Sequence, residues 1–357
     1  MPLDLSDTLV VGITSTALFD LTVEHAAFCS AMEENPDFAI ETYRAFVLAR
    51  EDEPLEPGTG YPLIRALLGL NRYMEADGAS PLVEVVVMSR NSPETGLRVL
   101  NSIRSQGLET TRSAFTGGES VVDYLQAFNV DLFLTTNPED AQRATDAGTC
   151  ATAVLLPPPS GESQQESADE VRIAFDGDAV LFNEESEIVF KTEGLERFHE
   201  TELAATRTPM LEGPYANLLR KLARLQDRIP ARVEYSPVRI SIVTARDAPA
   251  DRRVVYTLRH WGIYVDQVFF LGGLPKGPVL KALRPHIFFD DQDRHLDSAS
   301  LLVPSGKVPY PSGSQLRHAA AKPKRGEKQD ETGPEKANER RGKKPSPRRR
   351  DAPDAES

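Results

Sequence analysis

Two aspartates, Asp176 and Asp178, directly follow a short apolar stretch, residues 171–175, that has the composition of a buried strand. Ligands of open α/β sheets bind outside the carboxyl ends of the strands, so both side chains are expected to face a ligand crevice. A carboxylate can attack an electrophile, hold a divalent cation or move a proton. An Asp-Gly-Asp sequence is also an ordinary acidic turn, so its function depends on the groups that gather around it.

Three further strand or loop ends carry groups that complement this acidic pair. One apolar stretch ends in Thr244 and Arg246, a Gly-Gly turn leads to Lys276, and another apolar stretch ends in Asp290 and Asp291. A phosphoryl-transfer site needs a nucleophile, hydroxyl and ammonium groups for the phosphate oxygens, and carboxylates that hold Mg²⁺. Because so many carboxylates repel one another, their concentration also favours a site that binds a cation.

The apolar stretches alternate with amphipathic helical patterns, which predicts βαβ units and a mainly parallel α/β sheet. Residues 84–137 also align with residues 239–292 at a constant offset of 155 and without a gap. This self-similarity predicts two doubly wound modules in tandem. Identical pairs include Arg98/Arg253, Val99/Val254, Arg104/Arg259, Gly107/Gly262, Phe115/Phe270, Gly117/Gly272, Gly118/Gly273 and Phe133/Phe288.

The N-terminal module keeps the pattern of strands and helices but not the chemical groups. Its first strand leads to hydroxyl residues where the aspartates would be, and at the 155-residue offset neither the lysine nor the acidic pair is retained. We therefore predict a catalytically silent copy that packs against the other module, forms a subunit interface or borders the substrate pocket. Ser89 and Asn91 are the candidate substrate contacts in this half. The replacements are Thr14-Ser15-Thr16 at the position of the two aspartates, Ser89 for Thr244, Val121 for Lys276 and Thr135-Thr136 for Asp290-Asp291.

The ordered set of polar clusters resembles the four motifs of the haloacid dehalogenase (HAD) superfamily. The surrounding residues are similar to the cytosolic 5'-nucleotidase type I family over roughly residues 9–310. The resemblance implies a HAD-like fold, with doubly wound, mainly parallel sheets. It is carried by AFDGDAVLF at 174–182, VTAR at 243–246, FLGGLPKGP at 270–278, PHIFFDDQ at 285–292 and SRNSPETG at 89–96.

This resemblance also implies a mechanism on a nucleoside 5'-monophosphate such as AMP. Asp176 would attack phosphorus and form an aspartyl-phosphate, and Asp178 would protonate the leaving oxygen and then activate water. Thr244 and Lys276 would bind the phosphoryl oxygens, and Arg246 is a further candidate substrate contact. Mg²⁺ would be held by Asp176, the backbone carbonyl of Asp178 and at least one of Asp290 and Asp291.

Two alternatives stay open at this point: a HAD phosphatase for another small phosphate monoester, and a non-catalytic binding protein. His286 and His295 flank the acidic pair, and we interpret both as structural because magnesium prefers oxygen ligands.

Composition divides the chain into an N-terminal half at 1–156, a Pro- and Gly-containing linker at 157–170, a catalytic half at 171–311 and a disordered basic tail at 312–357. A small cap insertion is expected at about 183–235, between the second aspartate and the next motif. The tail holds 13 Lys/Arg against 8 Asp/Glu, whereas residues 1–311 hold 28 against 46. An acidic body argues against specific nucleic-acid binding, because that requires clustered basic residues.

The sequence gives no sign of a membrane or secretory protein. No apolar run approaches the roughly 18 residues that a membrane span needs, and the N-terminus lacks the pattern of a signal peptide. A cytoplasmic location is therefore expected. Cys29 and Cys150 have neither disulfide nor zinc spacing. A homo-oligomer is left open.

Overall fold

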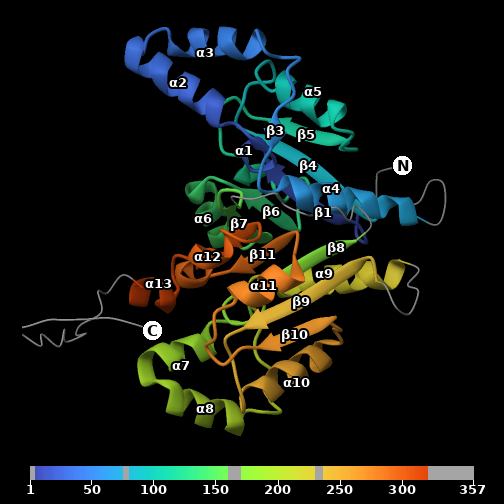
Figure 1. The fold of residues 1–357 in the computed structure, drawn as a ribbon, viewed down its shortest axis with the longest axis vertical. Coiled ribbons are helices and arrows are strands. Elements are labelled where there is room, and N and C mark those ends of the chain that lie inside the picture. The colour runs from blue at the N-terminus through green and yellow to red at the C-terminus, as the bar shows by residue number, and fades with distance from the viewer. Residues whose placement is uncertain (1–4, 75–79, 160–169, 230–235, 321–357) are drawn as a thin grey trace, which may run out of the picture. The chain divides into compact units, whose positions relative to one another are not determined.

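The computed structural model describes residues 5–74, 80–159, 170–229 and 236–320 (Figure 1). Most of the predicted linker and the tail from residue 321 onward lie outside these residues. The described part of the chain belongs to one compact unit that ends at Ala321, so the two predicted halves share a single body.

The described residues confirm the predicted α/β class. Ten strands form one sheet in the order β10-β9-β8-β11-β12-β7-β6-β1-β4-β5. Neighbouring strands run parallel, except that β12 and β7 are antiparallel. The central strands are nearly continuous apolar runs, as expected for strands that are covered on both faces.

The N-terminal half of the sheet contains β1, β4, β5, β6 and β7, and a short second sheet pairs β2 with β3. Its elements are β1 (Leu9–Thr14), α1 (Ser15–Leu18), β2 (Phe19–Asp20), α2 (Thr22–Glu34), α3 (Ala39–Leu48), β3 (Glu56–Pro57), α4 (Tyr61–Gly69), the 3₁₀ helix η1 (Leu70–Tyr73), β4 (Val83–Ser89), α5 (Leu97–Ser105), β5 (Arg112–Phe115), the 3₁₀ helix η2 (Val122–Tyr124), β6 (Leu132–Thr135), α6 (Pro138–Ala147) and β7 (Ala151–Leu155).

The C-terminal half continues the same sheet. Its elements are β8 (Val171–Phe175), α7 (Glu185–Glu193), α8 (Leu195–Ala204), α9 (Ala216–Arg228), β9 (Val238–Thr244), α10 (Asp251–Trp261), β10 (Gln267–Phe270), α11 (Gly277–Leu283), β11 (Ile287–Asp290), α12 (Asp293–Ala299), β12 (Ser305–Lys307) and α13 (Gln315–Ala320).

The strand order of one half matches that of the other. The order β5-β4-β1-β6-β7 corresponds to β10-β9-β8-β11-β12, and the bounds of β4, β5 and β6 each differ by 155 residues from those of β9, β10 and β11. Because β7 and β12 are antiparallel, the carboxyl ends of the strands in the two halves lie at opposite edges of the sheet where the halves meet. A ligand site built on each half would therefore open at a different edge.

The predicted cap insertion is shorter in the structure than about 183–235. The excursion begins at Asn183 and ends at Leu211, where the Asn183 amide donates to the Leu211 carbonyl at 2.9 Å. Only α7 and α8 lie in this excursion (Figure 1). The amphipathic α9 buries four leucines in the main core instead, because their spacing places them on one face of the helix: Leu218, Leu219, Leu222 and Leu225.

The start of the tail also differs from the prediction. Residues 312–320 were expected to be disordered, but Leu316 is buried and α13 contacts α7. The Ser312 hydroxyl and amide both donate to the Asp146 carboxylate, at 2.6 and 2.7 Å. One buried leucine and a few polar contacts thus extend the ordered chain beyond the point where its composition changes.

Within the described ranges, no helix is both long and apolar enough to cross a membrane.

Replacing Leu222 by Ala should lower the free energy of unfolding by about 2–5 kcal/mol, because it removes a fully buried side chain from the core under the sheet. The matched control is Leu203→Ala on α8, whose side chain is 59% exposed and should cost less than about 0.5 kcal/mol. Urea unfolding followed by circular dichroism measures both. Equal effects of the two substitutions would contradict the packing of α9 on the sheet.

Candidate functional site

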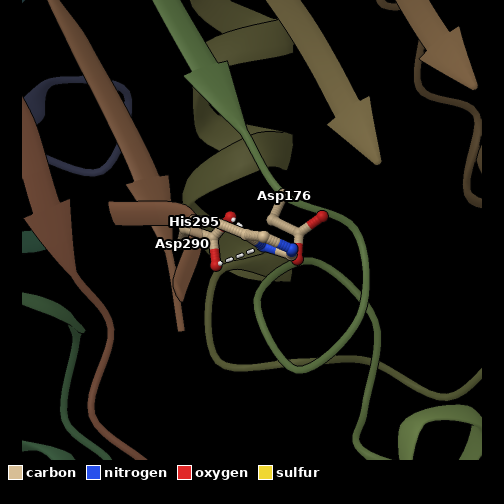
Figure 2. A group of neighbouring side chains, drawn as sticks. All are labelled: Asp176, Asp290 and His295. Carbon is tan, nitrogen blue, oxygen red and sulfur yellow. Dashed lines mark hydrogen bonds and ion pairs between the residues drawn. The ribbon is translucent and has the colours of Figure 1, made fainter. Parts of the chain in front are cut away.

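The strands β8 and β11 bring Asp176 and Asp290 together at one edge of the sheet. The strands pair in parallel, and the Asp176 amide donates to the Phe289 carbonyl at 2.8 Å. Both carboxylates are buried. Figure 2 shows them facing one another at the strand ends, with His295 of α12 beside them. The sequence predicted this meeting, since carboxyl ends of neighbouring parallel strands lie at the same edge.

Lys276 lies between these two carboxylates. Its Nζ atom is 2.8 Å from Asp176 Oδ1 and 2.6 Å from Asp290 Oδ2, and its side chain is 1% exposed. Burial lowers the pKa of Lys276, but the two aspartates outweigh burial and raise it, so the ammonium keeps its charge. A buried ammonium is tolerated because it is paired and hydrogen-bonded.

The two aspartates respond differently to this environment. Burial raises the pKa of Asp176 to about 6; Lys276 opposes the rise, and the charge of Asp290 adds to it. Burial also acts on the pKa of Asp290, but Lys276 and His295 outweigh it and lower that pKa below its ordinary value. The pair therefore holds one firmly ionised carboxylate beside one that takes up a proton close to neutrality.

Asp291 has a carboxylate oxygen that lacks a partner among the described residues. One oxygen accepts a hydrogen bond from the Tyr310 hydroxyl, whereas Oδ1 is buried without one. Burial and the charges of Asp290 and Asp176 raise the pKa of Asp291 well above its ordinary value. Three buried carboxylates beside a single ammonium leave an excess of negative charge, which a bound cation would neutralise. The residues present therefore fit a divalent cation.

One group in the described part of the chain has the geometry of a metal site: Asp176, Asp290 and His295, whose ligand atoms all lie within 4.8 Å of one another. His295 Nδ1 is 3.1 Å from Asp290 Oδ2. The sequence interpretation treated His295 as structural, so the structure adds it to the candidate set. The side chains of Asp178 and Asp291 are not in this group, although both were predicted to be near the metal.

The Asp178 carboxylate is held by Arg246. The guanidinium donates to both of its oxygens, at 2.6 and 2.8 Å, and also to Glu202 Oε2 of α8 at 2.6 Å. All three side chains are buried. The two acidic residues outweigh burial and raise the pKa of Arg246. The arginine, predicted as a substrate contact, is thus occupied by carboxylates and links the Asp-Gly-Asp loop to α8.

Thr244 lies at the end of β9, beside the Asp-Gly-Asp turn. Its side chain is buried, and a Cβ placed on Gly177 would be 3.3 Å from its Oγ1 atom. Glycine therefore lets the turn approach the threonine closely. Of the predicted site residues, the structure brings together Asp176, Lys276 and Asp290, with His295 beside them. Thr244 lies against the Asp-Gly-Asp turn that begins at Asp176.

The structure does not place Ser89 and Asn91 with these residues. Ser89 ends β4 in the N-terminal half and Asn91 follows it, and both line a separate cavity together with Thr14 and Thr16. Because β7 and β12 pair in antiparallel fashion, β4 runs opposite to β8, β9 and β11, and its end lies at the other edge. A second cavity, of about 740 Å³, is lined by residues of both halves, among them Ala179, Tyr310 and the start of β7.

Sequence reasoning missed Glu202 and Tyr310. Glu202 accepts hydrogen bonds from Arg246, Arg253 and Ser186, and Tyr310 donates to Asp291. Neither residue lies in a motif or directly follows a strand of the sheet, so only the folded chain reveals them. His286, in contrast, accepts a hydrogen bond from the Arg172 amide at 3.0 Å, and burial lowers its pKa to about 4.

A mainly parallel α/β sheet with a buried lysine and several carboxylates at its strand ends defines a protein that can bind a cation together with an anionic group. The chain belongs to the 5'-nucleotidase family, whose model, described as 5'-nucleotidase, matches residues 1–315. The family predicted from the motifs is thereby confirmed.

The chain is also similar to the human protein named cytosolic 5'-nucleotidase 1B. The two are 33% identical over 302 residues, which is 83% of this chain and 48% of the human protein. The chain thus spans about half the length of that curated relative. No solved structure matches the chain.

Substituting Met for Arg246 should lower the free energy of unfolding by about 3–5 kcal/mol, because Asp178 and Glu202 would be left buried without their common partner. Arg220→Met is the control, since Arg220 pairs with the half-exposed Glu212 and should cost no more than about 1 kcal/mol. Urea unfolding at neutral pH compares the two, and a similar small loss for both would contradict this role of Arg246.

Divalent-cation affinity should increase with pH. A metal ligand must be ionised, and the pKa of Asp176 is about 6, so a proton competes with the cation below that pH. Titration calorimetry with MgCl₂ and MnCl₂ at pH 5, 6 and 7 should show affinity rising by about tenfold overall, with proton release on binding. Asp176→Asn should flatten this dependence. Affinity that is unchanged over this range would argue against Asp176 as a ligand.

Proposed function

We propose that the chain is a Mg²⁺-dependent 5'-nucleotidase that hydrolyses nucleoside 5'-monophosphates, such as AMP, to a nucleoside and phosphate. The observation that carries the proposal is the buried Asp176, paired with Lys276 and followed two residues later by Asp178 at the carboxyl ends of parallel strands. Family membership and the name of the human relative support the same reaction. The name of that relative also supports a cytosolic location.

We further propose that the fold is HAD-like and arose as a tandem repeat with a silent N-terminal copy. Support comes from the matching strand order of the two halves and from the 155-residue spacing of three strand pairs. The positions of the catalytic groups in the N-terminal half carry hydroxyls or an apolar side chain, so that copy lacks a nucleophile of the same kind.

In the first step, a carboxylate oxygen of Asp176 attacks phosphorus while the bond from phosphorus to the 5'-oxygen breaks. Asp178 gives its proton to that oxygen, so that the neutral nucleoside leaves. Lys276 favours the ionised form of Asp176 that the attack requires. The Lys276 ammonium and the Thr244 hydroxyl bind phosphoryl oxygens, where negative charge develops.

In the second step, Asp178 accepts a proton from water as the water oxygen attacks phosphorus. The bond from phosphorus to the Asp176 oxygen breaks, phosphate leaves and the Asp176 carboxylate is restored. The two steps together consume one monoester and one water and yield one alcohol and one phosphate. Asp178 thus acts first as an acid and then as a base.

Arg246 is a positioning residue for Asp178 in this scheme. Its guanidinium holds both oxygens of the carboxylate, so one of them must be freed before a proton can be carried. The remaining pair with Glu202 would keep the guanidinium in place when that happens. Because Glu202 lies on α8, the position of the cap helix and the freedom of Asp178 are linked.

Asp176, the backbone carbonyl of Asp178 and one or both of Asp290 and Asp291 would hold the cation. Mg²⁺, when bound, supplies the positive charge that lets an anionic nucleophile approach a phosphate dianion. His295 Nδ1 donates a hydrogen bond to Asp290 Oδ2 and thereby orients that carboxylate. The oxygen-rich donor set favours Mg²⁺ over softer metals.

Asp176→Asn should reduce phosphate release at least about a thousandfold, because the amide is a poor nucleophile and a weak cation ligand. A panel of nucleoside 5'-monophosphates and sugar phosphates, assayed with Mg²⁺ or EDTA, measures the rate and the preferred substrate. Asp293→Asn is the matched control, since that nearby carboxylate is 70% exposed.

The outcomes of this assay separate the alternatives. Preference for nucleotides supports the 5'-nucleotidase, and preference for another monoester identifies a different HAD phosphatase. If folded wild-type protein released no phosphate from any substrate, the chain would be a binding protein and the proposal would be wrong.

A further inference from the structure

The N-terminal half contains a cavity of about 1680 Å³ at the carboxyl ends of its own strands. Its lining includes residues that follow β1, β4 and β6, such as Thr16, Asn91 and Thr136. Ligand cavities typically measure about 300–1,000 Å³, so a small metabolite fits without rearrangement. The position corresponds to that of the catalytic cluster, but at the other edge of the sheet.

Hydroxyl groups form the floor of this cavity. Leu9 of β1 pairs with Val83, and Val171 of β8 pairs with the corresponding residue Val238. Leu9 therefore corresponds to Val171, and Thr14, five residues after Leu9, corresponds to Asp176. Thr16 and Thr136 take the positions of the second aspartate and of Asp291. The Thr16 and Thr136 hydroxyls are 2.6 Å apart, and the Thr14 and Thr16 hydroxyls are 3.2 Å apart.

The floor is therefore uncharged where the catalytic site is ionised. Val121, fully buried, stands at the position of Lys276. The two arginines of the lining are already paired: Arg90 with Asp140 and Arg44 with Glu94. The lining as a whole is acidic, which disfavours a phosphate dianion; its carboxylates are Asp20, Glu24, Glu94, Glu139 and Asp140.

Aromatic side chains also line this cavity. The helices α2 and α3 pack side by side (Figure 1) and contribute Phe28 and Tyr43 to the lining. These two rings meet edge to face, with centroids 5.4 Å apart. Both side chains are partly exposed, and Phe19 of β2 also lines the cavity. Rings of this kind provide apolar faces for a flat ligand group.

We propose that this cavity is a second binding site, distinct from the catalytic one, and that it takes an uncharged nucleoside. Thr14, Thr16 and Thr136 exchange hydrogen bonds with the ribose hydroxyls, and the base lies against Phe28 and Tyr43. The choice of a nucleoside over another hydroxylated aromatic molecule rests on the proposed function, whose product is a nucleoside.

The test uses the full chain carrying Asp176→Asn, so that nucleotides are not consumed. Titration calorimetry with adenosine, AMP, adenine and ribose gives the affinities. Hydrogen exchange measured by mass spectrometry then locates the adenosine. The double variant Thr16→Val, Thr136→Val removes two exposed hydroxyls while keeping side-chain shape, and Thr42→Val on α3, outside the lining, is the matched control.

Adenosine should slow exchange in residues 14–48 and 89–95, and the double variant should weaken that binding about tenfold or more while the control leaves it unchanged. Tyr43→Leu should weaken it as well. AMP, adenine and ribose should each bind this cavity more weakly than adenosine.

Three results would overturn the proposal: protection by adenosine confined to residues 183–211, equal binding of adenosine by the double variant and the control, or AMP, adenine or ribose protecting residues 14–48 as strongly as adenosine. Phosphate release by the wild-type chain is measured separately. A chain that binds adenosine in this cavity but releases no phosphate would refute the proposed hydrolysis without refuting the site.

Discussion

The burial of Lys276 between Asp176 and Asp290 is the interaction on which the candidate active site of this protein depends. An ammonium without solvent persists only where carboxylates compensate for its desolvation, and here it bridges the ends of two neighbouring strands. The two aspartates nevertheless differ in pKa. Asp290 also accepts a hydrogen bond from His295 and stays ionised, whereas the pKa of Asp176 rises to about 6. The parallel pairing of β8 with β11 and the position of α11 are the structural conditions for this arrangement.

The antiparallel contact between β7 and β12 organises the rest of the molecule. It joins two sets of five strands into one sheet and, at the seam, turns their carboxyl ends toward opposite edges. A residue pair that corresponds in sequence, such as Ser89 and Thr244, is therefore separated in space. The start of β7 lines one cavity together with Ala179 and Tyr310, and the N-terminal half has its own hydroxyl-lined cavity at the other edge.

Ion pairs connect α8 to Asp178, the proposed acid and base. Glu202 of α8 accepts hydrogen bonds from Arg246, Arg253 and Ser186, and Arg246 also donates to Asp178. Each of these side chains is buried or nearly so, and loss of one would leave another uncompensated. The cap helix and the proposed acid and base of the reaction are thus parts of one hydrogen-bonded network, which no spacing in the sequence indicates.

The sequence by itself determined the family, the α/β class and the positions at which Asp176, Lys276 and Asp290 end their strands or loops. These features are local: a buried strand is an apolar run, and the residue that follows it is at the sheet edge. The 155-residue offset found in the sequence is also the spacing between three pairs of strands in the structure. Only the tertiary structure decided which polar groups meet across long separations, such as Glu202 with Arg246 or Tyr310 with Asp291. It also decided that α9 covers the sheet, that residues 312–320 join the fold and that Ser89 lies at the other edge. Strand direction at the seam and contacts between distant helices depend on how elements pack, and local composition does not encode them.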